Sequence, residues 1–550
     1  MTMICVPILA DDPAIAKRDA ILAAEMGGDI VEFRVDLLME LEESLESRIA
    51  IITNLIEESA LPCIVTCRPE WEGGMYSGAE DERVSMFEAV GTAEHPPAYI
   101  DVELKAYTAS ANIRQKINLA VDHPKQQRHV RTRLILSTHD FEGRPADLTR
   151  RLIAMHDEPA CSVVKVAYRA RSIRDNLELF EILSERQKPT IALGMGEFGL
   201  MSRVLAPKFG GFLTFASLRD ASATASGQPM IQELLGMYRF RSIKPSTKVY
   251  GIIGWPVTQS MSPLVHNAGF EAIGWDGVYV PMPVEESYES FKATIISLIE
   301  HSNLSFSGSS VTIPHKAHLL QIATDQGIGN LWLNDSDTAA CGAGNTLVVS
   351  PVFDAEEHRE FAVYNTDSKA VWSLLSYLDV WSDKHVAVVG SGGVARAASA
   401  PFVARGARVD LFARNANTAE SLVAQLNALD DIGPAENAEA QSHRLDDLVN
   451  SQCQIYINCT PVGMAGGPDP DGLSIPIPDL PPLPPETVFF DTVYNPIETP
   501  MLREAKARGY RTIDGVQMFV KQAEAQFDLW TGQSPPEGLF DRLVRERLAP

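Results

Sequence analysis

The sequence has 550 residues, of which 45% are hydrophobic and 22% charged, and it carries a net charge of −25 at pH 7. A chain of this length is too long for one hydrophobic core, and at about 150 residues per domain it predicts roughly three or four domains. The composition argues against long disorder, and the acidic balance disfavours nucleic acid and anionic lipid as partners, because such binding relies on clustered Lys and Arg.

The cysteines and the N-terminus indicate the compartment. Seven cysteines are an odd number and show no paired CxxC spacing, so we predict reduced core residues in a reducing compartment. The first residues, MTMICVPILADDP, contain neither a basic leader with a long apolar stretch nor an Arg/Ser-rich amphipathic segment, and no apolar run reaches about 18 residues. We therefore expect a soluble, cytoplasmic protein without a membrane partner.

Residues 1–240 alternate short apolar runs with longer amphipathic stretches. The apolar runs predict eight strands, beginning near residues 3, 30, 62, 98, 133, 162, 189 and 211. This repeat, with helix-forming sequence between the strands, is typical of a (β/α)₈ TIM barrel. A doubly wound sheet of eight strands is the alternative.

Charged residues gather where these strands end. In a barrel, residues i and i+2 at the carboxyl end of a strand point inward together, so side chains from several strands converge there. The converging set is Glu32, Arg34, Arg68, Glu72, Asp101, Glu103, His139, Lys165, Ser202 and Arg203. A structural salt-bridge network without chemistry is the alternative interpretation for any single pair.

The run SVVKVAY places Lys165 inside a buried strand. Burial disfavours the ammonium form, so a neutral amine becomes available to attack a carbonyl. The resulting iminium acidifies the adjacent C–H, and His139 is placed to remove that proton and return it to a departing hydroxyl. Arginines at positions 34, 68 and 203 suit an anionic substrate. These residues predict a Schiff-base lyase or aldolase that acts on an acidic keto sugar or keto ring.

Seven motifs in this region resemble type I 3-dehydroquinate dehydratase, in order along the chain: EFRVD, TCRPEWEGG, IDVEL, STHDF, KVA, MGEFGLMSR and SGQP. The resemblance implies that Lys165 forms the imine with 3-dehydroquinate, that His139 moves the proton, and that Glu72 orients His139. It also implies substrate contacts, from Glu32, Arg34, Arg68, Arg203, Gln228 and Thr224, the last standing where the family usually has Ser.

A polar, proline-containing segment near residue 245 indicates a linker. Farther along the chain, a strand-like run is followed by a glycine-rich turn. VAVVGSGGVARA comes after an apolar strand and places Gly390, Gly392 and Ala395 in G-x-G-x-x-A spacing. The amides at such a helix start can cradle a pyrophosphate. Arg414 ends the next predicted strand. An acidic residue at that position would favour NAD, whereas an arginine suits the 2′-phosphate of NADP, so we predict NADP. A glycine turn that binds nothing is the alternative.

Polar residues between the linker and the glycine turn suggest a second site. Ser260 and Ser262 share one short loop, and Thr312 and Lys316 follow a predicted strand. Asp367 is placed to hold the Lys316 ammonium while the lysine exchanges a proton with an alcohol or ketone oxygen during hydride transfer. A surface salt bridge with scattered hydroxyls is the alternative.

Residues 248–550 resemble shikimate dehydrogenase, on the motifs already quoted and on INCTPVGM, DTVYNPIETPML and DGVQMFVKQAEAQFDLWTG. The resemblance implies acid/base work by Lys316 and Asp367. It implies substrate contacts from Ser260, Ser262, Thr312, Asn345, Tyr494 and Gln522. It further implies NADP(H) contacts from Gly390, Gly392, Gly393, Ala395, Arg414, Thr460 and Gly515.

Together the two resemblances imply a three-part α/β chain. A TIM-barrel dehydratase spans 1–240, an α/β shikimate-binding domain spans 248–370 and is completed by 515–550, and a Rossmann NADP domain spans 371–514. Its small-molecule partners would be 3-dehydroquinate, 3-dehydroshikimate and shikimate, in consecutive steps. A quinate/shikimate catabolic enzyme with quinate dehydrogenase activity and a non-catalytic metabolite sensor are the alternatives. No metal site is predicted, because no cluster with ligand spacing occurs.

Overall fold

The computed structural model describes residues 1–41, 43–122, 131–219, 227–324, 331–333, 336–353, 359–378, 384–428 and 439–549. It divides into two compact units. The first comprises residues 1–247 with 280–283 and 301–304, and the second comprises 248–279, 284–300 and 305–550. The break near residue 247 coincides with the predicted linker.

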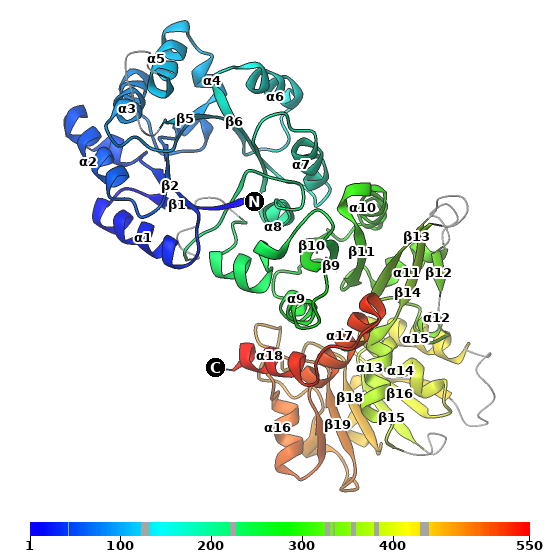
Figure 1. Ribbon diagram of the computed structural model, residues 1–550. Coiled ribbons are helices and arrows are strands. Elements are labelled where there is room, and N and C mark those ends of the chain that lie inside the picture. The colour runs from blue at the N-terminus through cyan, green and yellow to red at the C-terminus, as the bar shows by residue number, and fades with distance from the viewer. Residues whose placement is uncertain are drawn as a thin grey trace. The chain divides into compact units, whose positions relative to one another are not determined.

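The first unit is built on eight parallel strands that curl into a barrel (Figure 1). The strands are β1 (Met3–Leu9), β2 (Ile30–Arg34), β3 (Cys63–Thr66), β4 (Tyr99–Glu103), β5 (Arg133–Asp140), β6 (Cys161–Arg169), β7 (Thr190–Met195) and β8 (Leu213–Phe215). β1 pairs with both β2 and β8. At the other end of the sheet, the Phe212 N–H donates to Thr190 O at 2.8 Å, beside β8 and β7. The predicted barrel is confirmed, and the doubly wound alternative is wrong.

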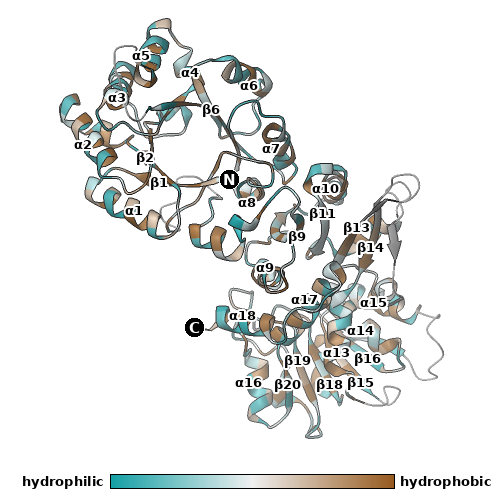
Figure 2. Ribbon diagram, viewed as in Figure 1, coloured by the Kyte–Doolittle hydropathy of each residue, from teal (hydrophilic) through white to brown (hydrophobic). Residues whose placement is uncertain are grey.

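Helices surround the barrel: α1 (Pro13–Glu25), α2 (Leu45–Glu57), α3 (Glu80–Thr92), α4 (Leu104–Tyr107), α5 (Ala111–Val121), α6 (Leu148–Asp157), α7 (Asp175–Ser184) and α8 (Leu200–Val204). Figure 2 shows largely hydrophobic strands and helices whose surfaces alternate between hydrophobic and hydrophilic residues. That alternation lets each helix bury one face against the sheet and leave the other in water.

One residue or two from each strand form an apolar layer inside the barrel: Cys5, Ile30, Ile64, Tyr99, Ile135, Val163, Ile191, Leu193, Leu213 and Phe215. Because side chains in a strand alternate with a period of two, the next inward position lies two residues farther along. At that level the side chains turn polar, with Glu32, Asp101 and Lys165 all buried. The apolar layer is thus the floor beneath a polar site.

The second unit contains two six-stranded sheets. One has the order β10-β9-β11-β13-β14-β12 and includes antiparallel pairs on both sides of β13. Its strands are β9 (Lys248–Gly254), β10 (Gly277–Pro283), β11 (Phe306–Val311), β12 (Leu331–Leu333), β13 (Thr346–Phe353) and β14 (Arg359–Tyr364). The helices between them are α9 (Ser262–Ala272), α10 (Tyr288–Glu300), α11 (Lys316–Thr324), α12 (Ser336–Cys341) and α13 (Thr366–Leu375).

The other sheet is entirely parallel, with the order β17-β16-β15-β18-β19-β20. This is the 3-2-1-4-5-6 order of the Rossmann fold, which confirms the predicted fold class. The strands are β15 (His385–Val389), β16 (Arg408–Ala413), β17 (Glu439–Arg444), β18 (Ile455–Asn458), β19 (Val488–Asp491) and β20 (Arg511–Ile513). The helices that follow these strands are α14 (Gly393–Val403), α15 (Ala416–Asn427) and α16 (Pro500–Ala507). Two further helices, α17 (Gly515–Thr531) and α18 (Leu539–Leu548), come after β20 and pack against α9 and the first of the two sheets.

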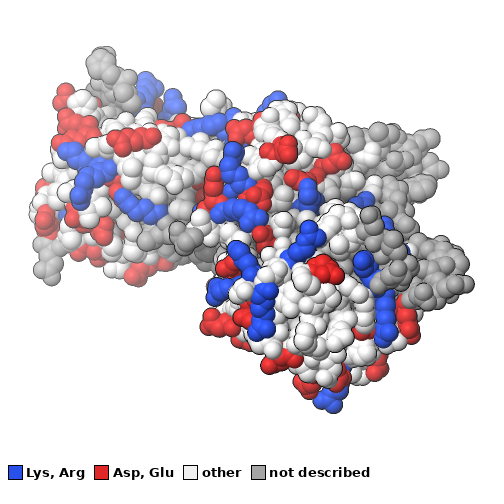
Figure 3. Space-filling model, turned by 90° about the horizontal axis from the view of Figure 1, so that it is seen from below, with Lys and Arg blue, Asp and Glu red and all other residues white. Residues whose placement is uncertain are grey.

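Two whole-chain expectations can be compared with the structure. The seven cysteines are free in the structure, and six of them are buried while Cys459 is half-buried. Among the described residues, no helix has both the length and the apolar character needed to cross a bilayer. On the face drawn in Figure 3, basic side chains are interspersed with acidic ones instead of forming one extended basic surface.

Candidate active sites

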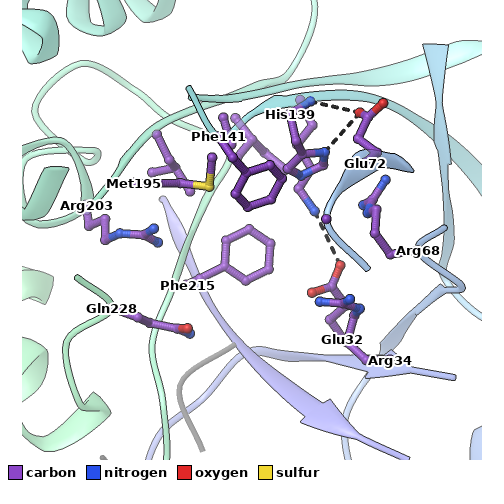
Figure 4. A pocket seen from close by; sticks show the side chains of 15 residues that line it. Glu32, Arg34, Arg68, Glu72, His139, Phe141, Met195, Arg203, Phe215 and Gln228 are labelled. Carbon is purple, nitrogen blue, oxygen red and sulfur yellow. Dashed lines mark hydrogen bonds and ion pairs between the residues drawn. The ribbon is translucent and has the colours of Figure 1, made fainter. Parts of the chain in front are cut away.

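The first site is a cavity at the carboxyl ends of the barrel strands (Figure 4). It gathers the predicted catalytic and substrate-contact residues that the structure describes. Three members of the converging set, Asp101, Glu103 and Ser202, are fully buried and do not line the cavity. The lining is Glu32, Arg34, Arg68, Glu72, Gly73, His139, Phe141, Lys165, Ala167, Ile191, Leu193, Met195, Arg203, Phe215 and Gln228. Thr224 lies outside the described residues.

Lys165 is 5% exposed and is held by two carboxylates. Its Nζ donates to Asp101 Oδ2 at 2.7 Å and to Glu32 Oε1 at 3.3 Å, and it lies 4.7 Å from the centre of the Phe215 ring. Burial of Lys165 and the nearby arginines were predictable from the sequence. The structure adds two anionic partners that offset the desolvation of the ammonium and fix the direction of Nζ.

The three predicted arginines differ in what they contact. Arg68 pairs with Asp101 at 2.9 Å and with Glu103 at 2.5 Å, and Arg34 pairs with Asp36 at 2.5 Å. Arg203 is 2% exposed, and its Nε has no hydrogen-bond partner among the described residues. Burial lowers the pKa of Arg203 to about 10. An anion that enters the cavity would accept a hydrogen bond from this buried guanidinium and offset its desolvation cost.

His139 lies against Glu72 at the rim of the cavity (Figure 4). Glu72 Oε1 accepts from the His139 backbone N–H at 2.8 Å and lies 3.2 Å from Nδ1. Burial and the neighbouring Arg68 and Lys165 hold the pKa of His139 well below its usual range, so the ring is neutral. Burial raises the pKa of Glu72 to about 7. With Glu72 ionised, Nδ1–H donates to it and Nε2 is left as the ring nitrogen that can accept a proton.

This pair predicts the acid limb of the lyase reaction. Below pH 7 the Glu72 carboxyl is protonated and donates to Nδ1, so the proton of the ring sits on Nε2 and the base is lost. We expect kcat/KM for dehydration to fall on the acid side with an apparent pKa of about 7. In Glu72→Gln this limb should disappear and kcat should drop. Exposed Glu70→Gln, from the same short helix, is the control, and an unchanged limb in Glu72→Gln would contradict the assignment.

Several lining residues were not predicted from the sequence. Phe141, Met195 and Phe215 face the cavity between Arg203 and Gln228 on one side and His139, Glu72 and Arg68 on the other (Figure 4). Asp101 was placed at the strand end but was given no role, although it contacts Lys165 most closely. The alternation of IDVEL already points Asp101 to the same side as Glu103, which is the signal that was available.

The second site is a cavity in the second unit. It is lined by Ile252, Pro256, Val257, Gln259, Ser260, Ser262, Ser310, Val311, Thr312, Lys316, Asn345, Asp367, Val394, Thr492, Tyr494, Gly515, Met518, Phe519, Gln522 and Gln526. Every residue predicted to contact the second substrate is in this set. Val394, in the first turn of α14, brings the cavity next to the glycine turn.

Lys316 and Asp367 form a direct pair in this cavity. Lys316 opens α11, Asp367 lies in the first turn of α13, and Nζ donates to Asp367 Oδ2 at 2.5 Å. Both side chains are largely buried, at 14% and 9% exposure, so the pair is not a surface salt bridge. A half-desolvated ammonium that faces a cavity can give a proton to an oxygen that becomes negative.

A buried hydrogen-bond chain supports the floor of this cavity. Tyr279 OH donates to Ser310 Oγ at 2.7 Å, and Ser310 Oγ donates to Gln526 Oε1 at 2.8 Å. Gln526 Nε2 donates to Thr346 Oγ1 at 3.1 Å. Gln522 was predicted from the sequence, whereas Gln526, one helical turn farther on the same face of α17, was not.

The glycine turn between β15 and α14 fits a dinucleotide phosphate. Gly390 has φ +120° and its Cβ would lie 3.0 Å from Cys459 O, whereas a Cβ on Gly392 or Gly393 would meet nothing within 4 Å. Gly392 caps α14 without a side-chain hydrogen bond, so the first amides of the helix are not used by a cap. Arg414 lies exposed just beyond β16.

The remaining predicted cofactor residues lie around the same sheet edge or the adjoining helix. Ala395 is buried in α14, and Thr460 follows β18 and donates through Oγ1 to Asn458 Oδ1 at 2.7 Å. Gly515 opens α17 and lines the cavity; a Cβ there would lie 2.2 Å from Val493 O. Only glycine permits that close approach of two backbone segments.

The two cavities define a two-site enzyme, with a lyase in the barrel and an oxidoreductase in the second unit. Three family models match the chain: type I 3-dehydroquinase over residues 4–245, the shikimate dehydrogenase substrate binding domain over 252–347, and the shikimate 5'-dehydrogenase C-terminal domain over 515–545.

Curated relatives match nearly the whole chain. The chloroplastic bifunctional 3-dehydroquinate dehydratase/shikimate dehydrogenase of Arabidopsis thaliana is 35% identical over 555 residues, which cover 99% of this chain and 84% of the relative. The shikimate biosynthesis protein AroDE of Chlamydia pneumoniae is 28% identical over 96% of this chain and 95% of its own length. A solved shikimate dehydrogenase in complex with NADP+ is 30% identical, covering 56% of this chain and 98% of its own, with a TM-score of 0.46. The chain belongs to the family of bifunctional 3-dehydroquinate dehydratases/shikimate dehydrogenases.

Proposed function

We propose that this chain catalyses two consecutive reactions. The barrel dehydrates 3-dehydroquinate to 3-dehydroshikimate through a Schiff base, and the second unit reduces 3-dehydroshikimate to shikimate with NADPH. The observation that carries this proposal is the presence in one chain of a buried Lys165 beside the His139–Glu72 pair and of a Lys316–Asp367 pair next to a glycine turn.

In the barrel, Lys165 attacks the ketone as an amine once its ammonium has released a proton to a neighbouring carboxylate. That proton and a second one from the nitrogen leave with the ketone oxygen as water, which gives a protonated imine, the iminium. This iminium accepts the electrons of the adjacent C–H bond when His139 removes the proton. The same histidine then protonates the departing hydroxyl, and water hydrolyses the imine to free Lys165. Arg203, whose Nε lacks a partner among the described residues, holds the substrate carboxylate, with Gln228, Arg34, Arg68, Glu32 and Thr224 completing the contacts.

In the second unit, Lys316 gives a proton to the carbonyl oxygen as it becomes an alcohol, and Asp367 holds the ammonium in place. Bound NADPH supplies the hydride. Ser260 and Ser262 bind the substrate carboxylate, and its hydroxyls and ring contact Thr312, Asn345, Tyr494 and Gln522. The turn at Gly390, Gly392, Gly393 and Ala395 holds the pyrophosphate, with Arg414, Thr460 and Gly515 around it.

The proposed function assigns one task to each part of the chain. The dehydratase spans 1–240, the shikimate-binding domain spans 248–370 with 515–550, and the NADP domain spans 371–514. Both substrates are small carboxylates that bind in local pockets, which suits an acidic, cytoplasmic enzyme that has no nucleic-acid or membrane partner.

The full chain, supplied with 3-dehydroquinate and NADPH, should release shikimate and oxidise one NADPH per molecule formed. In the reverse direction, kcat/KM for shikimate with NADP+ should exceed that for quinate with NAD+. A preference for quinate would favour the catabolic enzyme over the biosynthetic one. Absence of both activities would favour the non-catalytic metabolite sensor.

Arg414 should set the cofactor preference. A charge-assisted contact with the 2′-phosphate contributes about 1.5–3 kcal/mol, so Arg414→Ala should lower kcat/KM for NADPH by roughly 10- to 100-fold and leave that for NADH unchanged. Arg508→Ala, which removes an exposed arginine directly after α16 that is paired with Glu504, is the control. Equal losses with both cofactors would contradict this role.

A further inference from the structure

A cluster of metal-ligand side chains lies in the parallel sheet of the second unit, near the start of its strands. His385 opens β15, Asp410 is the third residue of β16, and Cys453 precedes β18. One ligand atom from each of these three residues lies within 4.8 Å of the other two. A second histidine, His443 on β17, brings Nε2 to 3.2 Å from Asp410 Oδ1.

The surroundings of Asp410 are unusual for a carboxylate. Asp410 is 5% exposed and stands on the sheet face that otherwise packs apolar residues such as Ala387, Phe412 and Phe489. An unpaired charge in such a place is costly. His385 Nε2 lies 2.5 Å from Oδ2, Arg408 Nε lies 3.7 Å from Oδ1, and the two histidines hold the pKa of Asp410 below its usual value.

One contact in the cluster is not a hydrogen bond. Asp410 Oδ1 and His443 Nε2 are both buried and face each other at 3.2 Å, yet they lack the geometry of an N–H···O bond with any described partner. Two lone-pair donors at this separation match neighbouring ligands of one cation, because ligands about 2.0–2.1 Å from a tetrahedral zinc are about 3.4 Å apart.

We propose that His385, Asp410 and Cys453 bind one divalent cation of the zinc class, and that His443, which faces Asp410 Oδ1, turns toward this cation as the fourth ligand. Two imidazoles, one carboxylate and one thiolate are a donor set that zinc prefers in tetrahedral sites. Binding replaces the short His385–Asp410 contact by two metal–ligand bonds, and the Cys453 thiol releases its proton to solvent. Thiolate is the form of cysteine that binds zinc, so the thiol loses its proton as the cation binds.

The position of this site points to a structural role. The cluster joins β15, β16, β17 and the segment before β18, four places that are separate in the sequence. His385 is at the opposite end of β15 from the glycine turn that follows Val389. The cation would therefore stabilise the sheet without touching the substrates, and the inference does not depend on the proposed reactions.

The test uses the full chain after chelator treatment. One equivalent of Co²⁺ should produce the absorption of a tetrahedral site together with a thiolate-to-cobalt charge-transfer band, and Zn²⁺ should displace it and raise Tm. Cys453→Ser should lose the charge-transfer band. His443→Ala should weaken Zn²⁺ binding by about 100-fold or more, since even outer-shell partners commonly contribute 10- to 100-fold. Cys161→Ser, which removes a buried cysteine of the barrel, is the matched control.

Two results would overturn the proposal. The first is that the unsubstituted chain binds less than one equivalent of Co²⁺ or shows no thiolate band. This result does not depend on whether a substituted protein folds. The second is a folded Cys453→Ser that keeps the same band as the control, because the thiolate would then come from another cysteine.

Discussion

Lys165→Ala should abolish dehydration and leave reduction intact. The variant loses the only lysine among the described residues that line the barrel cavity, so no imine can form. Removing a covalent nucleophile commonly costs about 10⁴-fold or more in kcat. The Lys316–Asp367 pair lies in the other unit, so NADPH-dependent reduction of 3-dehydroshikimate should stay near its normal rate. Separate assays of the two reactions measure this.

Borohydride trapping tests the same lysine directly. In the presence of 3-dehydroquinate, borohydride should reduce the imine and leave a stable adduct on Lys165, detected by peptide mass spectrometry. Lys17→Ala, which removes an exposed lysine of α1 paired with Glu58, should trap and turn over normally. Trapping on a different lysine, or substantial dehydration by Lys165→Ala, would refute the Schiff-base mechanism.

The barrel strands were predictable because each one carries its own apolar run. SVVKVAY, for example, lies within the observed β6, and the run beginning near 98 became β4. Closure of the barrel was not decided by the sequence, because a doubly wound sheet repeats the same strand–helix period. The structure decides it through the pairing of β1 with β8, the first and last strands of the barrel sequence, together with the Phe212–Thr190 hydrogen bond beside β7 and β8.

The partners of Lys165 show a similar limit. Its burial follows from seven residues of sequence, but its ion pairs reach Glu32 and Asp101, which are 133 and 64 positions away. Curvature of the barrel brings β2, β4 and β6 around one interior, and no local pattern measures that curvature. The burial of Lys165 was therefore predictable, but the carboxylates that offset its desolvation were not.

The metal-ligand cluster is the clearest case of information absent from local spacing. Zinc motifs are recognised when ligands recur a few residues apart, as in paired cysteines. Here His385, Asp410, His443 and Cys453 come from separate strands and a connecting segment, so the sequence predicted no metal site. Only the parallel register, which pairs His385 with Arg408 and Ala387 with Asp410, brings the donors together.

Lys316→Ala should remove most of the reductase activity. Without its ammonium, no described side chain at that point of the cavity gives a proton to the developing alkoxide, and general acids contribute about 10²- to 10⁴-fold. Hydride transfer should therefore slow by that factor in single-turnover measurements, which separate chemistry from product release. Dehydration should be unaffected.

Asp367→Asn should give a smaller loss, since it leaves the lysine but weakens its orientation. Because the two side chains act as one unit through a 2.5 Å contact, the double variant should lose no more activity than Lys316→Ala alone. Lys521→Ala, which removes a half-exposed lysine of α17 paired with Glu524, is the control. Losses that add in the double variant would mean that Lys316 and Asp367 act independently, and the proton-transfer role of the pair would then have to be abandoned.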